Sequence, residues 1–349
     1  MPSEYNDYYI VSTSALISIA DTIRSKAGIV GTLAFPSEFI TGINAISGGG
    51  GGGDYTIDDI ATRNFPTTIE GSASLIANYA FYGATDIVSA SFSQATEIGV
   101  SAFAICSNLT TASFNAVVTT YNYAFLNCSN LSSLYMPSVV TIGSSTFYGC
   151  SALSIIDLPK ASYIKDYAFS GCTGLTDISL PKALQLSLYA FTSCTNLVSV
   201  EVPNALYISN GVFYSCKKLQ SVSLKKASMI GSSMFYNCYD LTDVYMPSVA
   251  SIYAYGFYNC SILSQLTFSK LTEIRNYAFQ RCFHLINLNL SQQSTVPTLS
   301  NSNAFSSTPI GGYTTSAGQY GSIYVPSSLY AAFSTSTNWA YFAARMVSV

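Results

Sequence analysis

The sequence is poor in charged residues. Only 9% of its 349 residues are charged, against the quarter typical of globular proteins, and the formal net charge is −3. The chain therefore has no broad positive field of the kind that attracts nucleic acids or anionic membranes. No stretch reaches the roughly 18 apolar residues that a spanning helix requires. We expect no nucleic-acid partner and no membrane insertion.

The residues needed for hydrolytic or metal chemistry are also scarce. The one histidine, His284, directly precedes Leu285. A surface or cap residue is a simpler interpretation of this histidine than a member of a catalytic triad. Asp58 and Asp59 are adjacent, and neighbouring carboxylates in a strand or loop diverge. The sequence contains no C-x-x-C pair, no metal-binding histidine spacing and no phosphate-binding loop. We predict a protein that is not an enzyme and that takes no cofactor or metal.

What the sequence does contain is a 22-residue repeat. Its nine cysteines are all separated by 22 residues and stand at Cys106, Cys128, Cys150, Cys172, Cys194, Cys216, Cys238, Cys260 and Cys282. Phenylalanine keeps the same period from Phe81 to Phe279, and a leucine follows each cysteine by three places. Three residue types that stay in phase over this length indicate a stack of about ten repeated coils.

Each unit predicts a short β-strand followed by a turn. In the unit that begins at Leu175, Ile178 and Leu180 are two residues apart and point to one face of a strand, which Pro181 ends. One unit cannot close a core, so each Leu, Ile, Phe and Cys must pack on its counterparts in neighbouring coils. The odd number of cysteines and their equal phase predict a column of buried, reduced thiols, with Ala84 and Thr308 in the same position at the two ends.

The segments outside the repeat predict a head and a cap. Apolar residues at helical spacing predict two short helices over 14–27 and 37–47, so residues 1–47 form a small helical module for attachment or oligomerisation. Six glycines at 48–53 form a linker, residues 54–305 the solenoid and residues 306–349 a cap. Within the cap we expect a strand at Ile323 to Val325, and Trp339 and Phe342 over the apolar end.

At this level of detail the sequence resembles a known family. Units such as "LPKASYIKDYAFSGCTGLTDISL" are similar to the BspA-like leucine-rich repeats of bacterial surface proteins. The end, "SIYVPSSLYAAFSTSTNWAYFAARM", and the beginning, "IADTIRSKAGIVGTLAFPSEFITGINAI", resemble segments found in tail and tail-fibre proteins of phages and prophages of Gram-positive bacteria. The resemblance implies a virion protein assembled in the host cytoplasm. The N-terminus, which has no basic region followed by an apolar run, does not read as a secretory signal peptide.

Two surfaces of the predicted solenoid are candidates for ligand binding. Tyrosine stands two places before or one place after the repeated phenylalanine, at Tyr79, Tyr123, Tyr167, Tyr189, Tyr255 and Tyr277 and at Tyr82, Tyr148, Tyr214, Tyr236 and Tyr258. Such rings suit stacking on sugars, although they could equally shield the core phenylalanines. The outward strand positions vary, with Tyr135, Asp157, Glu201 and Tyr245 among them. A sparse row of Lys160, Lys182, Lys226 and Lys270 is more simply explained by solubility than by phosphate binding.

These features lead to one main functional hypothesis and two alternatives. The main hypothesis is a phage tail adhesin whose solenoid recognises a host cell-surface glycan or protein and whose residues 1–47 contact other tail proteins. A homo-oligomer through this head is possible, because a two-helix module buries too little to stand alone. The alternatives are a structural tail component without a receptor and a bacterial cell-surface adhesin of the same repeat family.

Overall fold

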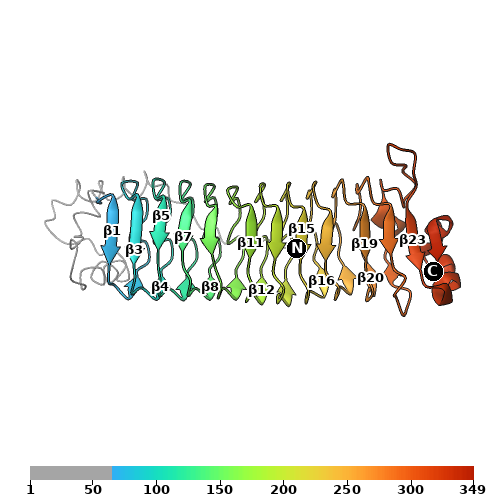
Figure 1. The fold of residues 1–349 in the computed structure, drawn as a ribbon, viewed down its shortest axis with the longest axis horizontal. Coiled ribbons are helices and arrows are strands. Elements are labelled where there is room, and N and C mark those ends of the chain that lie inside the picture. Colours follow the sequence, from blue (N-terminus) through green and yellow to red (C-terminus); the bar gives the residue numbers. More distant parts are fainter. Residues whose placement is uncertain (1–64) are drawn as a thin grey trace, which may run out of the picture.

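The protein folds as one long rod of stacked turns (Figure 1). The structure is a computed structural model and describes residues 65–349. About thirteen turns are present, and two rows of short parallel strands run along the rod. With neighbouring strands about 4.8 Å apart, twelve intervals give a rod on the order of 60 Å long. The predicted repeat solenoid is therefore confirmed, with more turns than the ten that the repeat marks.

The first row supplies one strand to each turn. The central residue of most of these strands, such as Ile178 in β11, is buried between two more exposed neighbours. Pro181 follows β11 closely, as expected of a residue that cannot donate to the ladder. The strands are β1 (Thr68–Gly71), β3 (Ser89–Phe92), β5 (Thr111–Ser113), β7 (Ser133–Tyr135), β9 (Ile155–Asp157), β11 (Asp177–Ser179), β13 (Ser199–Glu201), β15 (Ser221–Ser223), β17 (Asp243–Tyr245), β19 (Gln265–Thr267), β21 (Asn287–Asn289), β23 (Ser322–Val325) and β24 (Met346–Ser348).

The second row consists of two-residue strands, each with its second residue buried. Their register offsets are 22 residues through most of the stack, as in Tyr163↔Gln185 and Gln185↔Tyr207. They are β2 (Leu75–Ile76), β4 (Glu97–Ile98), β6 (Thr119–Thr120), β8 (Thr141–Ile142), β10 (Tyr163–Ile164), β12 (Gln185–Leu186), β14 (Tyr207–Ile208), β16 (Met229–Ile230), β18 (Ser251–Ile252), β20 (Glu273–Ile274) and β22 (Thr298–Leu299). Both rows are divided into separate hydrogen-bonded sheets, the first after β9 and β17 and the second after β14.

The third side of each turn is a run of tight turns rather than a strand. The N–H groups of Tyr167, Phe169 and Gly171 donate to carbonyls of the next turn at 2.9, 2.8 and 2.9 Å. The residues between them donate to carbonyls three positions earlier in their own turn. Tyr167 and Gly171 have φ of 55° and 72°. This left-handed backbone directs alternate N–H groups towards the neighbouring turn, so the third side is also bonded from turn to turn.

The core consists of columns of identical side chains. Eleven phenylalanines from Phe81 to Phe305 lie with neighbouring ring centroids 5.0–5.8 Å apart, and their interplanar angles stay small. Such offset stacks add roughly 0.5–1.5 kcal/mol per pair beyond burial. The nine cysteines form a parallel column, and all are free and fully buried. The predicted thiol column is confirmed, and Ala84 and Thr308 are likewise buried at its ends.

Each thiol also makes a hydrogen bond that the sequence does not reveal. The Sγ of every cysteine donates to the carbonyl of the phenylalanine 25 residues earlier, at 2.9–3.2 Å. That carbonyl already accepts the N–H of the cysteine in its own turn, as Phe169 does from Cys172 at 3.1 Å. Thr308 occupies the last position and donates instead to Phe305 in its own turn at 2.7 Å. The column thus ties each turn to the one before it.

The C-terminal end of the stack is covered by the cap. Phe342 meets Phe305 edge-on at 5.1 Å, and Trp339 lies 6.1 Å from Phe305 while its indole N–H donates to the carbonyl of Pro297 at 2.7 Å. These side chains come from η3 (Trp339–Arg345), which follows η2 (Ser327–Leu329) and α4 (Tyr330–Thr335); η1 (Ser302–Phe305) lies in the last repeat. The expected covering role of Trp339 and Phe342 is confirmed. The strand β24, which pairs with β23, was not predicted.

The predicted helices over 14–27 and 37–47, the glycine linker and the first part of the 54–305 segment lie outside the described residues. The attachment role of residues 1–47 stays a prediction. Among residues 65–349, no helix has both the length and the apolar character needed to cross a membrane.

Candidate functional site

The predicted tyrosines lie along the third side of the rod, in two adjacent columns. Those two places before the phenylalanine all have left-handed backbone, with φ between 53° and 62°. The same position in other turns holds Ser101, Ser145, Gly211 and Ser233, also with positive φ. This backbone costs a residue with a Cβ roughly 1–2 kcal/mol, and a bulky aromatic is uncommon there. Glycine and serine show that the fold itself does not require tyrosine at this position.

Seven of the eleven predicted tyrosines form one continuous band of ring contacts. Stacked pairs join Tyr167 to Tyr189 at 5.3 Å, Tyr255 to Tyr277 at 5.1 Å, and Tyr214 through Tyr236 to Tyr258 at 4.7 and 4.4 Å. Edge-to-face contacts join the stacks at 5.7–6.5 Å. We call this set the tyrosine band: Tyr167, Tyr189, Tyr214, Tyr236, Tyr255, Tyr258 and Tyr277.

The remaining predicted tyrosines lie outside the band. Tyr79 and Tyr82 form a separate edge-to-face pair at 6.1 Å near the first described turn. Tyr123 and Tyr148 make no ring contact with the band and are 40% and 43% exposed. In contrast, most band tyrosines are only partly exposed. The expectation that ring faces are free to stack on sugars is therefore modified within the band, because there the rings cover one another.

Gly211 makes the link between the two columns possible. A Cβ built on Gly211 would overlap the ring of Tyr189, and the φ of Gly211 is +63°. Tyr189 lies over this glycine and meets the edge of Tyr214 in the other column at 6.0 Å. A side chain at residue 211 would displace the ring of Tyr189, so the glycine is needed for its empty space, whereas tyrosine and serine adopt the same left-handed backbone in other turns.

Arg281 is the charged residue next to the band, and the sequence interpretation missed it. It occupies a second left-handed position, φ 64°, where other turns place Gly149, Asn237 or Asn259. A hydrogen bond to the Tyr258 hydroxyl raises the pKa of Arg281. Among the described residues, the one ion pair within 4 Å joins Arg275 to Glu273, so no carboxylate neutralises Arg281. At this position the repeated turns hold Gly, Ser or Asn except for Ile105 and Arg281, so a charged residue there was the signal that could have identified it.

Tyr236, in the middle of the band, has a perturbed phenol group. Burial first, and then the neighbouring Tyr258 and Tyr214, raise the pKa of Tyr236. A neutral phenol both donates and accepts hydrogen bonds. No buried side-chain nitrogen or oxygen atom among the described residues lacks a hydrogen-bond partner. Tyr255 is 36% exposed, and Tyr214 and Tyr277 are half-buried.

The predicted strand-face residues are exposed, and only Tyr135 and Asp157 lie on adjacent strands. Tyr135 and Asp157 are register neighbours on β7 and β9. Glu201 and Tyr245 lie two turns apart with Ser223 between them. Tyr135 is 49% and Tyr245 57% exposed, and five turns separate them. Of the four predicted residues, the strand face thus brings together one pair, Tyr135 and Asp157, and keeps Glu201 and Tyr245 apart.

The other residues singled out in the sequence have simple positions. Lys160, Lys182, Lys226 and Lys270 are all exposed. The Nδ1 of His284 lies 2.7 Å from the carbonyl of Ser261, a link between turns that Asn108 and Asn196 make at the same position of their turns. Within residues 65–349, no group of three or more His, Cys, Asp or Glu could hold a metal ion. Asp58 and Asp59 lie outside the described residues.

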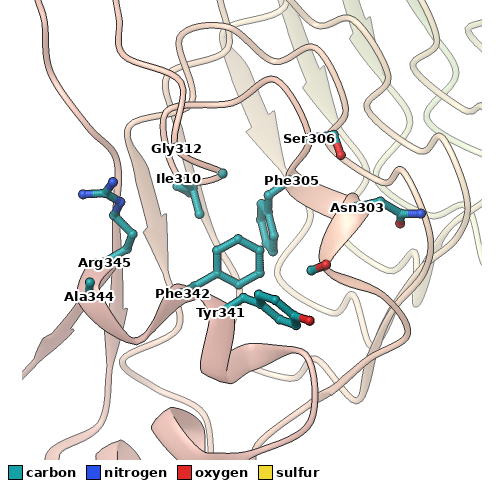
Figure 2. Close-up of a pocket in the computed structure, with 11 residues that line it drawn as sticks. Asn303, Phe305, Ser306, Ile310, Gly312, Tyr341, Phe342, Ala344 and Arg345 are labelled. Carbon is teal, nitrogen blue, oxygen red and sulfur yellow. The ribbon is translucent and has the colours of Figure 1, made fainter.

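A hollow of about 380 Å³ lies beside the cap (Figure 2). Phe305, Phe342 and Ile310 point into it, and Tyr341, 77% exposed, lies at its rim. Arg345, on the same η3, stacks on Tyr320 with its guanidinium carbon 3.8 Å from the ring centroid. The apolar floor is the cap packing already described, so the hollow forms where η3 meets the last repeat.

Comparison with known proteins found similar solved structures but no curated relative. None of the curated proteins matches the chain. Among solved structures, a leucine rich cell surface protein from Faecalibacterium prausnitzii is 20% identical, with 79% of this chain and 80% of that chain covered and a TM-score of 0.44. A leucine-rich repeat protein from Bacteroides ovatus is 18% identical, covering 84% and 93%, with a TM-score of 0.39. The T. pallidum leucine rich repeat protein is 22% identical, covering 57% and 78%, with a TM-score of 0.36.

The family itself is defined by the repeats. The model of the BspA type leucine rich repeat region matches in six copies, over residues 64–163, 140–261 and 207–320. These ranges together extend through most of the 349-residue chain and coincide with the turns that carry the phenylalanine and cysteine columns. The chain therefore belongs to the BspA-type leucine-rich repeat family.

Proposed function

We propose that the protein is an adhesin that recognises a host cell-surface glycan or protein through exposed residues of its solenoid, and that it does so on a phage tail. The observation that carries the recognition role is the contrast between core and surface. The Phe and Cys columns are constant from turn to turn, whereas the outward strand position differs between neighbouring turns, as in Tyr135, Asp157, Ser179 and Glu201. Constant columns hold a rigid scaffold, and variable positions on it provide a specific surface.

The phage setting is supported by the resemblance of the two ends of the chain to tail-protein segments. In this proposal residues 1–47 attach the protein to other tail proteins, and the solenoid projects from them. The low charge of the chain fits recognition by hydrogen bonds and aromatic contacts rather than by long-range attraction.

The direct experiment measures binding of the fluorescently labelled full chain to intact cells of a panel of Gram-positive bacteria. We expect saturable binding to a subset of strains, with periodate treatment abolishing it for a glycan receptor and protease treatment for a protein receptor. The chain after heat unfolding is the control. If no strain binds the chain while virions still assemble with it, the receptor role is refuted and the structural tail component is favoured.

A second observation separates the phage from the cell-surface alternative. Tail genes beside the coding sequence favour the virion protein, whereas an adjacent sortase or secretion locus favours a bacterial surface adhesin. Immunogold labelling of purified virions with antibody to the full chain tests the same point, and unlabelled virions would contradict the tail assignment.

A further inference from the structure

The tyrosine band offers a regular array of polar groups along the rod. From Tyr167 to Tyr277 it crosses five turn-to-turn steps, about 24 Å of the rod at 4.8 Å per step. Because the rings stack on one another, their faces are largely unavailable, and what the band presents are ring edges and hydroxyls. The centroids of stacked rings lie 4.4–5.3 Å apart, and edge-to-face contacts at 5.7–6.5 Å join the stacks.

A regular array of neutral donors and acceptors matches a ligand whose own polar groups recur along its length. Linear glycans have this property, since each sugar presents hydroxyls at a constant repeat. Phenol hydroxyls can donate to and accept from such groups, and the apolar ring edges can contact the sugar C–H surface. A globular protein has no corresponding repeat, and nucleic acid would require many more cations than this chain carries.

Arg281 adds one charge beside the C-terminal half of the band. Its guanidinium lies beside the Tyr258 hydroxyl and has no carboxylate partner among the described residues. A guanidinium binds carboxylate, sulfate or phosphate oxygens with paired hydrogen bonds. The ligand should therefore bear an acidic group at a position that reaches Arg281.

We propose that the tyrosine band and Arg281 bind a linear acidic glycan lengthwise along the rod. The ring hydroxyls contact sugar hydroxyl and carbonyl groups, and Arg281 contacts one acidic substituent. This inference rests on the proposed recognition function and names the face and the chemical class of its ligand.

The test measures binding of the full chain to immobilised hyaluronan, polygalacturonate and poly(glycerol phosphate). Methyl-esterified polygalacturonate is the matched neutral polymer. The band variant is Tyr236→Phe with Tyr258→Phe, which keeps both rings and removes both hydroxyls. The control is Tyr163→Phe with Tyr207→Phe, two tyrosines of the second strand row that are 38% and 70% exposed and lie outside the band. Unchanged circular dichroism establishes that each variant folds.

We expect the chain to bind at least one acidic polymer and to prefer polygalacturonate to its methyl ester. The band variant should bind about tenfold more weakly or worse, since each lost hydrogen bond weakens binding about two- to tenfold, and the control should bind like the wild-type chain. Arg281→Gln should remove the preference for the acid over the ester and should reduce the salt dependence.

Two results would overturn the inference. One is an absence of binding to every linear glycan, and the other is binding that the band variant leaves unchanged. If the chain fails on glycans but still binds cells in a protease-sensitive manner, the recognition function stands with a protein receptor and the glycan site does not. If it binds neither, both proposals fail.

Discussion

Replacing one thiol in the middle of the stack provides a stringent stability test of the cysteine column. Cys194 is fully buried, and its Sγ donates to the carbonyl of Phe169 at 3.1 Å. In Cys194→Ala that carbonyl keeps the N–H of Cys172, so no buried acceptor is orphaned. The loss is then the burial of one sulfur-sized group and a small residual cavity.

These contributions can be estimated separately. Burial of a group of this size contributes about 1 kcal/mol, the cavity costs about 0.5–1 kcal/mol more, and the weak S–H bond contributes about 0.5 kcal/mol. Cys194→Ala should therefore lower the free energy of unfolding by about 2 kcal/mol. Ser179→Ala, which removes an exposed hydroxyl of β11, is the matched control and should change it by less than about 0.5 kcal/mol.

The assay is guanidinium unfolding of the full chain, followed by far-UV circular dichroism and tyrosine fluorescence. The midpoint should fall while the slope stays the same, since the unfolded chain exposes a similar surface. A loss below about 0.5 kcal/mol would show that the thiol position is not closely packed. A loss above about 4 kcal/mol would mean that the thiol bears an interaction beyond the one hydrogen bond.

Three further predictions follow from the same contacts. Burial raises the pKa of Cys194 from 9.0 to about 12, so the unfolded thiol ionises before the folded one. The free energy of unfolding should be constant below about pH 8 and fall between pH 9 and 12 by up to about 1.4 kcal/mol per pH unit for each thiol whose pKa is raised in this way. A free energy of unfolding that stays constant up to pH 10.5 would contradict this prediction. Gly211→Ala should lower the free energy of unfolding by about 1–3 kcal/mol and alter the near-ultraviolet circular dichroism of tyrosine, because a Cβ there overlaps the ring of Tyr189. Ser233→Ala at the equivalent position is the control and should leave the spectrum unchanged. If the two variants gave the same spectrum, the contact of Tyr189 across Gly211 would be refuted. Trp339→Ala should lower the free energy of unfolding by about 3–5 kcal/mol and promote end-to-end association, measured by light scattering, because it uncovers Phe305. A variant that stays monomeric would contradict the covering role of Trp339.

The architecture was predictable because it is repeated. A residue such as Cys194 carries little information alone, but nine copies in phase define a column, and Ile178 with Leu180 defines the inward face of a strand. The ends were harder. β24 follows β23 after 20 residues that include η2, α4 and η3, so the 22-residue repeat does not mark it as a strand of the same sheet.

The site was predictable in composition but not in arrangement. Equal phase placed the tyrosines on one side of the rod, yet phase cannot show that Tyr189 crosses over Gly211 to reach Tyr214. Ring orientation depends on the left-handed backbone of Tyr189, φ 53°, which the sequence does not mark because tyrosine is an unusual residue there. Arg281 was missed for a similar reason, since it occurs once and outside the repeated pattern.

The most direct test of recognition through the tyrosine band is hydroxyl-radical footprinting of the full chain, free and bound to the cells or glycan that it recognises. Tyrosine side chains react with the radical, so the reactivity of the band tyrosines measures directly whether a ligand covers them. The account predicts that Tyr214, Tyr236, Tyr255 and Tyr258 become protected on binding, while Tyr207 on the second strand row stays as reactive as in the free chain. Protection of the strand-face residues Tyr135 and Tyr245 with an unchanged band would contradict it.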